Sequence, residues 1–220
     1  MLKNIVKNLK PSSTLKINET SSELEKKGEK VFKFGFGQSP FQVPSDIVDE
    51  LKKNSHQNKY LPMQGLKELR ETIAKYTSIK KGYDYNSKNV IIGPGSKELM
   101  FLLHILFDGE IILPIPSWVS YTPQAILGRN KIQSLQATSD NNWFPTATQI
   151  EKIILKDKNK NYLLFLNSPN NPSGQICKNL KEISEIAKKY NLIILSDEIY
   201  SELSFEEGFK SISSFYPEKT

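Results

Sequence analysis

Four short segments of this 220-residue sequence place polar or aromatic side chains among turn-forming residues, directly after apolar runs. They are residues 93–98, 114–121, 167–174 and 196–200. In an open α/β sheet, ligands bind in the crevice outside the carboxyl ends of the strands. We therefore expect the side chains of these segments to meet at one edge of a sheet and to form the binding site.

The first segment combines Gly93 and Gly95, which permit a tight turn, with Ser96 and Lys97 at the start of a predicted helix. Free backbone N–H groups at a helix start, a hydroxyl and a neighbouring lysine are suited to binding a phosphate. The same residues would also serve as an ordinary turn and helix cap. By itself, this segment leaves both interpretations open.

The other three segments offer different chemistry. Trp118 could stack on a planar ligand, or it could be a core tryptophan. Asn171 lies in a loop of turn-forming residues, where an amide side chain can bond a polar ligand group. Asp197 follows a fully apolar run, and a carboxylate that is buried there requires a positive or hydrogen-bond-donating partner.

Short apolar runs that alternate with amphipathic stretches predict a mostly parallel sheet flanked by helices. The N-terminal residues 1–33 are polar and are expected to form a peripheral arm, and residues 34–220 are expected to form one α/β domain whose C-terminal part is missing. Asn179 and Glu182 predict a capping box. The predicted helices are 47–51, 66–76, 98–107, 147–155 and 180–190, and the predicted strands are 90–92, 111–113, 131–137, 162–166 and 192–195.

Composition excludes several classes of function. The net charge of +6 comes from scattered lysines without a basic stripe, which favours a solvated surface over a nucleic-acid interface. Lysines interrupt the N-terminus before it reaches signal-peptide length, so we expect a cytoplasmic protein. Cys177 is the only cysteine, and His56 and His104 lack a metal-ligand pattern, so we expect no metal site. We expect Cys177 and His104 to be buried.

From about Phe34 to the C-terminus, the four segments in this order resemble the aspartate-aminotransferase-like family of fold-type I pyridoxal-phosphate (PLP) enzymes. The strings at 170–174 (NNPSG) and 196–200 (SDEIY) are specific as a pair. The resemblance implies that PLP is the cofactor and that a homodimer transfers amino groups between amino acids and 2-oxo acids. It assigns the phosphate to Ser96 and Lys97, stacking to Trp118, the phenolic oxygen to Asn171 and Tyr200, and the ring nitrogen to Asp197.

The same resemblance implies catalytic roles for Asp197 and Tyr200. A carboxylate keeps the pyridine nitrogen protonated, so that the ring withdraws electrons from the substrate carbanion. Tyr60 matches the family tyrosine that reaches the phosphate of the neighbouring subunit. Gly37 resembles the glycine near the substrate carboxylate.

One family feature is not found in these residues. The S-x-S-K motif, whose lysine anchors the cofactor, is expected several tens of residues after SDEIY. The run Ser211–Ser214 ends in serine, and Lys210 and Lys219 lack the flanking pattern. The small domain with its carboxylate-binding arginine is not found either. We therefore expect that this chain alone does not transaminate.

Three hypotheses remain open. The first is an aminotransferase part that retains the cofactor-site residues. The second is another reaction on the same scaffold, such as β-elimination, because the cofactor site leaves the reaction type open. The third is a non-catalytic remnant that binds a phosphate compound or a partner.

Overall fold

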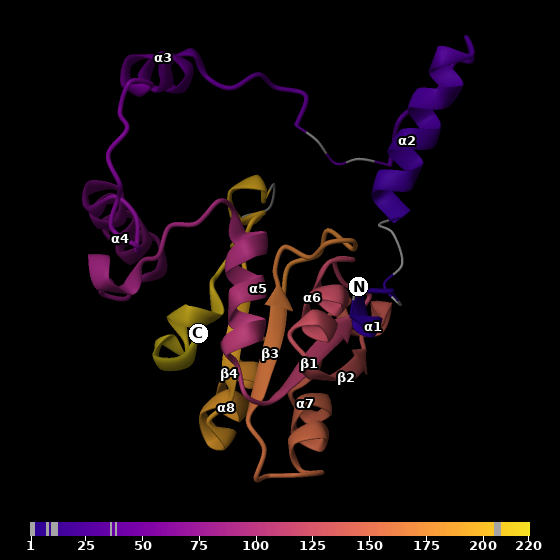
Figure 1. The fold of residues 1–220 in the computed structure, drawn as a ribbon. Helices are drawn as coiled ribbons and strands as arrows, with labels where there is room; N and C mark the ends of the chain where they lie inside the picture. Colours follow the sequence, from indigo (N-terminus) through magenta and orange to yellow (C-terminus); the bar gives the residue numbers. More distant parts are fainter. Residues whose placement is uncertain (1–2, 8, 10–12, 36, 38, 205–207) are drawn as a thin grey trace. The chain divides into compact units, whose positions relative to one another are not determined.

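The computed structural model describes residues 1–220 except for 1–2, 8, 10–12, 36, 38 and 205–207 (Figure 1). The chain divides into two compact units, Met1–Leu61 and Pro62–Thr220, which are described separately. No helix in the described parts of the chain combines the length and the apolar character needed to cross a membrane.

The first unit contains the helices α1 (Asn4–Lys7), α2 (Ser13–Lys26) and α3 (Ser45–Asn54). Helix α3 was predicted from its apolar spacing, whereas α2 was not, because its sequence is polar and weakly patterned. The side chains of Ile47 and Leu51 on α3 are exposed. The boundary between an arm and a domain after residue 33 stays a prediction.

The second unit is built on a sheet of four parallel strands, β1 (Glu110–Ile115), β2 (Lys131–Gln136), β3 (Tyr162–Asn167) and β4 (Ile193–Asp197). Their order is β2-β1-β3-β4, so the chain crosses over between β2 and β3. All of β3 is buried, as expected of a central strand in a parallel sheet. The predicted fold class is confirmed.

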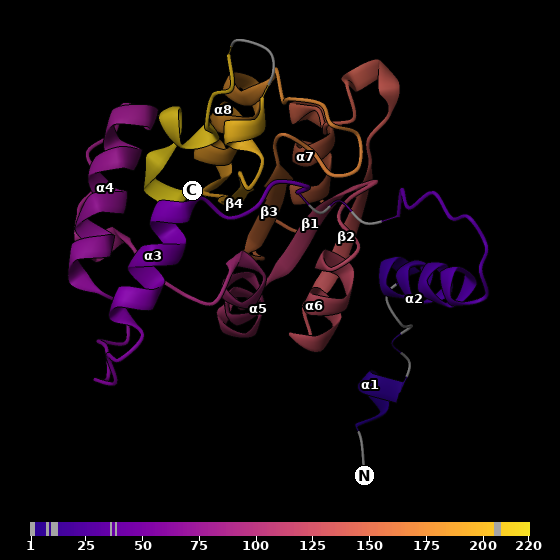
Figure 2. The same ribbon diagram turned by 90° about the horizontal axis from the view of Figure 1, so that it is seen from above.

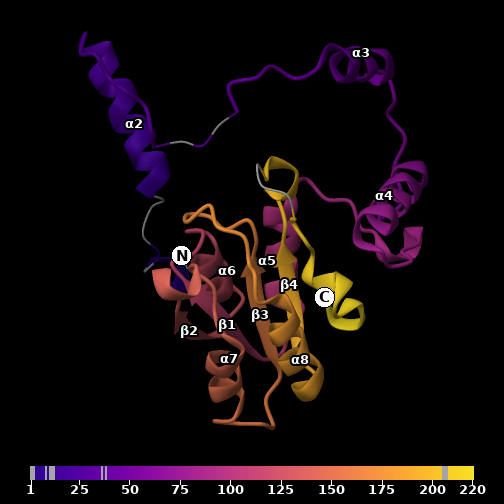
Figure 3. The same cartoon turned by 180° about the vertical axis from the view of Figure 1, so that it is seen from behind.

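Helices cover both faces of this sheet. Helices α5 (Ser96–Leu106) and α6 (Tyr121–Leu127) lie on one face, and α7 (Ala147–Ile154) and α8 (Leu180–Tyr190) lie on the other (Figure 2). The side chains of β3 alternate accordingly: Leu163 and Phe165 join the α5 and α6 core, and Leu164 and Leu166 join the α7 and α8 core. Seen from behind, α8 lies beside β4 (Figure 3).

The rest of the second unit is helical or irregular. Helix α4 (Lys67–Lys81) ends at Gly82, which adopts the left-handed conformation typical of helix ends. Both His104 and Cys177 are buried, as predicted. Short 3₁₀ turns occur at Ser87–Asn89, Ser139–Asn141, Ser201–Leu203, Ile212–Ser214 and Pro217–Lys219.

Two local predictions are wrong. Val90 has extended backbone angles, but the run Val90–Ile92 forms no strand, because no strand in the described part of the chain pairs with it. The amide of Ile92 bonds to the carbonyl of Gln64 instead. The capping box at Asn179 does not form, because its side chain donates to the carbonyl of Pro145 and accepts from the thiol of Cys177. Helix α6 was not predicted.

Candidate functional site

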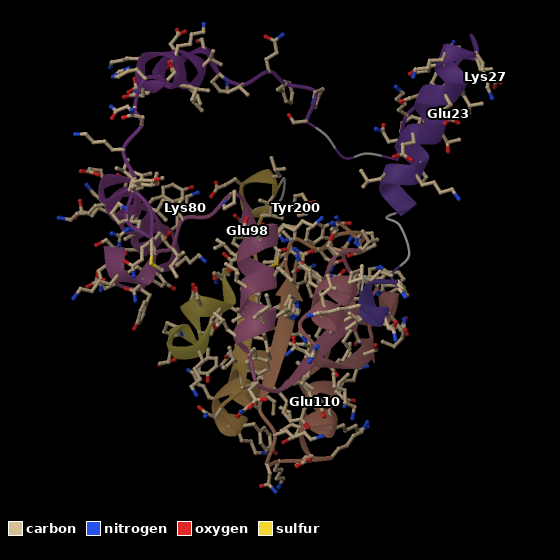
Figure 4. The ribbon with its side chains drawn as sticks, viewed as in Figure 1. Glu23, Lys27, Lys80, Glu98, Glu110 and Tyr200 are labelled. Atoms are coloured by element: carbon tan, nitrogen blue, oxygen red, sulfur yellow. The ribbon has the colours of Figure 1, made fainter. Side chains whose placement is uncertain are left out.

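A pocket of about 160 Å³ lies at the carboxyl end of the sheet. It is below the roughly 300 Å³ at which pockets for drug-sized ligands begin, so it suits a small molecule. Figure 4 labels Tyr200 at this end of the sheet and Glu110, the first residue of β1, at the other end. The lining residues are Ser96, Trp118, Tyr121, Asn167, Asn171, Asp197, Ile199 and Tyr200.

Asp197, the last residue of β4, has hydrogen bonds to both carboxylate oxygens. The hydroxyl of Tyr121 donates to Oδ2 at 2.6 Å, and the backbone amide of Ile199 donates to Oδ1 at 3.2 Å. The carboxylate is half-buried and lines the pocket. Each oxygen has room for a second bond, because a carboxylate can accept about four. The group is thus held in place and can still accept a proton donor from a ligand.

Tyr121 lies in the first turn of α6 and is buried. Its ring contacts the rings of Trp118 and Phe165 edge to face, with centroids 5.4 and 5.1 Å away. Burial and the negative charge of Asp197 raise the pKa of the Tyr121 phenol. The phenol therefore stays protonated and acts as a hydrogen-bond donor to Asp197.

A second hydrogen-bonded group joins the ends of β3 and β4. Asn167, the last residue of β3, donates from Nδ2 to the carbonyl of Asp197 at 2.9 Å. Its Oδ1 accepts from the amide of Asn171 at 2.7 Å. The side chain of Asn171 then donates from Nδ2 to the hydroxyl of Tyr200 at 3.4 Å. These bonds hold Asn171 and Tyr200 together beside Asp197, so that both can contact one ligand oxygen.

Ser96 is the first residue of α5, and its helix cap Gly95 has φ +100°, a conformation that disfavours other residues. A Cβ added at Gly93 would come within 2.8 Å of the end of the Leu99 side chain, so a larger residue there would require Leu99 to move. Lys97 does not line the pocket, but its Nζ lies 5.5 Å from the centre of the Trp118 ring. The turn thus brings an open helix N-terminus to the pocket and places a lysine beside Trp118, one of its lining residues.

Five of the residues predicted for one site, Ser96, Trp118, Asn171, Asp197 and Tyr200, are brought together in this pocket. Tyr60 and Gly37 lie in the first unit, where both are exposed. The chemical roles of all these residues stay predictions.

The other three lining residues, Tyr121, Asn167 and Ile199, lie within the segments 114–121, 167–174 and 196–200 that were expected to form the site, but sequence reasoning assigned them no individual role. The position of Asn167 at the end of an apolar run was a signal for its role, because the other strand ends were selected on that criterion. No comparable signal marked Tyr121, because its hydrogen bond to Asp197 joins residues 76 positions apart in the chain.

The sequence profile of the family described as aminotransferase class I and II matches residues 29–218. The aspartate aminotransferase of Bacillus sp. (strain YM-2) is 36% identical over 212 residues, which are 93% of this chain and 53% of that protein. The aspartate aminotransferase of Geobacillus stearothermophilus is 34% identical, covering 94% of this chain and 54% of that protein. The chain thus spans about half the length of these curated relatives.

Solved structures agree with this assignment. Aspartate aminotransferase from Thermus thermophilus with maleate superposes with a TM-score of 0.91 at 26% identity, covering all of this chain and 59% of that one. Aspartate aminotransferase from Thermotoga maritima superposes with a TM-score of 0.89 at 28% identity, covering 97% and 58%. From the profile match over most of its length, the chain belongs to the class I and II aminotransferase family.

Proposed function

We propose that this chain forms the cofactor-binding part of a PLP-dependent aminotransferase that moves an amino group between an amino acid and a 2-oxo acid. The observation that carries the proposal is the set of residues around the pocket. A carboxylate, an indole, an amide with a phenol, and a helix N-terminus surround a single small volume.

The chemistry of this donor set fits PLP. Asp197 complements a protonated ring nitrogen, and the Asn171–Tyr200 pair complements a phenolic oxygen. Trp118 offers an indole for stacking, and the free N–H groups at the start of α5 with the Ser96 hydroxyl complement a phosphate. When bound, PLP supplies the electron sink for carbanion chemistry.

Tyr121 keeps the Asp197 carboxylate in one orientation. Because its phenol is buried and stays protonated, the bond at 2.6 Å persists at neutral pH. Asp197 could then accept a hydrogen bond from the ring N–H without reorienting, which would lower the cost of binding. Asn171 and Tyr200 would hold the phenolic oxygen.

The remaining assignments extend the proposal to the whole protein. Tyr60 would reach the phosphate in the neighbouring subunit of a homodimer, and Lys97 would add positive charge near the phosphate. Gly37 would lie near the substrate carboxylate. The protein would act in the cytoplasm on amino acids and 2-oxo acids.

The proposal is tested by titrating the chain with PLP and measuring the quenching of tryptophan fluorescence. We expect Asp197→Asn to weaken binding about tenfold or more, because a charge-assisted hydrogen bond is lost. Asp140→Asn is the matched control, since Asp140 is an exposed acid outside the pocket, and it should leave the Kd unchanged.

Pyridoxal, which lacks the phosphate, adds a second arm to this titration. Ser96→Ala should weaken the binding of PLP but change the Kd of pyridoxal by less than about twofold, because only PLP bonds the hydroxyl through its phosphate. If PLP fails to bind, or if inorganic phosphate competes with it while Asp197→Asn has no effect, the hypothesis of a non-catalytic phosphate-binding remnant replaces this proposal.

A further inference from the structure

Ion pairs join the end of helix α4 to the turn that carries Tyr200. Lys81, the last residue of α4, pairs with Glu198 at 2.7 Å, and Lys80 pairs with Glu202 at 2.9 Å. Glu198 precedes Tyr200 in the chain and Glu202 follows it. The end of α4 thus bonds the turn on both sides of this tyrosine (Figure 4 labels Lys80 and Tyr200).

The turn itself is tight. The amide of Ser201 donates to the carbonyl of Glu198 at 2.9 Å, and the amide of Leu203 donates to the carbonyl of Tyr200 at 2.9 Å. Tyr200 has φ −101° and ψ 9°, which is close to the third residue of a type I turn. Because a side chain leaves the backbone in a fixed direction, the orientation of this turn decides where the Tyr200 hydroxyl lies.

The ion pairs differ in burial. The side chain of Glu198 is 12% exposed and that of Lys81 is 26% exposed, whereas Lys80 and Glu202 are both more than half exposed. An exposed ion pair contributes little because water screens it, but a largely buried carboxylate that loses its cation is left uncompensated. We therefore expect the pair between Lys81 and Glu198 to hold the turn more firmly than the outer pair does.

The carboxylate of Glu198 is also bonded from the other side. Its Oε1 accepts from the hydroxyl of Ser196 at 2.8 Å and from the hydroxyl of Ser211. Ser196 belongs to β4, and Ser211 is buried. The carboxylate therefore links α4 to the strand, and the turn begins from a fixed point.

The pocket gives Tyr200 less support than the turn does. Its hydroxyl accepts from Nδ2 of Asn171 at 3.4 Å, longer than the roughly 2.7–3.2 Å of an ordinary N–H···O bond. We propose that Lys81 and Glu198 are positioning residues, whose ion pair orients the turn so that the Tyr200 hydroxyl reaches the phenolic oxygen of PLP. This inference rests on the proposed function, because it requires PLP in the pocket.

Calorimetric titration with PLP and with 3-deoxypyridoxal 5′-phosphate, which lacks the phenolic oxygen, tests the proposal. Lys81→Met removes the charge and keeps an unbranched side chain. It should raise the Kd of PLP about fivefold and that of the deoxy ligand less than about twofold, because only PLP can bond the Tyr200 hydroxyl. Lys81→Arg keeps the ion pair and should bring the Kd of PLP to within about twofold of the wild-type value.

Two further variants sharpen the comparison. Glu198→Gln removes the charge of the other partner with little change of shape, and it should show the same selective effect as Lys81→Met. Lys189→Met is the matched control, because Lys189 also ends a helix and pairs with Glu151 at 2.7 Å but lies outside the pocket. It should change neither Kd by more than about twofold. Circular dichroism checks that each variant is folded.

Hydrogen exchange of the chains without ligand gives a second readout. In Lys81→Met, the amides of Ser201 and Leu203, which close the turn, should exchange about threefold faster or more than in the wild-type protein. In Lys189→Met, these amides should exchange at the wild-type rate.

The outcomes separate this inference from the function on which it rests. If the wild-type chain does not bind PLP, the proposed function is wrong and the inference falls with it. If the wild-type chain binds PLP, but Lys81→Met and Glu198→Gln weaken both ligands equally or neither of them, the proposed function stands and the positioning role is wrong. A Lys81→Arg variant that binds PLP as weakly as Lys81→Met would likewise overturn the role of the ion pair.

Discussion

At the scale of single residues, the pocket depends on how Asp197 is held. Its carboxylate is fixed by donors from two different elements, the Tyr121 hydroxyl of α6 and the Ile199 amide after β4. A hydrogen bond to a charged group is stronger than one between neutral groups. Tyr121 should therefore contribute to stability through this bond as well as through its buried ring.

We predict that Tyr121→Phe lowers the free energy of unfolding by about 1–2 kcal/mol at pH 7, because Oδ2 of Asp197 loses its donor while the ring remains. Urea unfolding followed by circular dichroism measures this loss. Tyr162→Phe is the matched control: its hydroxyl also belongs to a buried tyrosine but donates to a neutral backbone carbonyl, that of Asp157. An equal loss in both variants would contradict a special role for the bond to Asp197.

The wild-type protein and Tyr121→Phe should also respond differently to alkaline pH. Because the pKa of Tyr121 is raised in the folded state, its contribution to stability is complete below its ordinary pKa of 10.0 and is lost as pH rises above that value. The stability difference between the wild-type protein and Tyr121→Phe should therefore shrink between pH 9 and pH 11. Urea midpoints across this range measure it, and a constant difference would contradict the prediction.

At the scale of elements, helix α7 shows how a predicted helix obtains a cap that the sequence pattern did not assign. The Thr146 hydroxyl accepts from the amide of Gln149, and Oε1 of Gln149 accepts from the amide of Thr146. This is the reciprocal pattern of a capping box. The residue pattern at Asn179 and Glu182 fits the motif equally well, but Asn179 bonds elsewhere.

Thr146→Ala should therefore lower the free energy of unfolding by about 1 kcal/mol, because the first turn of α7 loses the acceptor for an otherwise unpaired N–H. Thr148→Ala is the control. Thr148 is exposed inside the same helix, where alanine is the better helix former, so stability should stay equal or rise. Equal destabilisation by both substitutions, measured in urea, would show that the cap contributes nothing specific.

Elements could be predicted where one short stretch of sequence decides the structure. The strands β1, β3 and β4 follow from apolar runs, β2 follows from the alternation of apolar and polar residues, and α5, α7 and α8 follow from helical spacing. Whether Val90–Ile92 forms a strand depends on a neighbouring strand. Whether Asn179 caps a helix depends on Pro145, which lies 34 positions away and accepts the hydrogen bond of its side chain. Contacts of this kind are set by the tertiary fold, which periodicity does not encode.

At the scale of the whole molecule, the residues predicted for the pocket were easier to recognise in the sequence than the residues that hold them in place. In a parallel sheet the strand ends meet at one edge, so Trp118, Asn171 and Asp197 converge once the strand order is right. Ser96 reaches the same pocket as the first residue of α5, although the run before it forms no strand. Tyr121 and Asn167 depend on side-chain directions that only the folded chain fixes. Tyr60 and Gly37 belong to the other unit, and their roles stay predictions.

The lysines of the second unit bear on how the cofactor would be held. Among the described residues, no lysine lines the pocket, and Lys210 and Lys219 lack the family motif. We therefore expect PLP to bind these 220 residues reversibly, through the turn at residues 93–96, the indole of Trp118 and the carboxylate of Asp197. Borohydride reduction of the mixture, followed by peptide mass spectrometry, should find only low labelling spread over surface lysines. The aspartate aminotransferase of Bacillus sp. (strain YM-2), treated in parallel, should give one dominant labelled peptide. Stoichiometric labelling of Lys97, Lys210 or Lys219 would contradict the prediction, because a lysine of this chain would then reach the cofactor without the family motif.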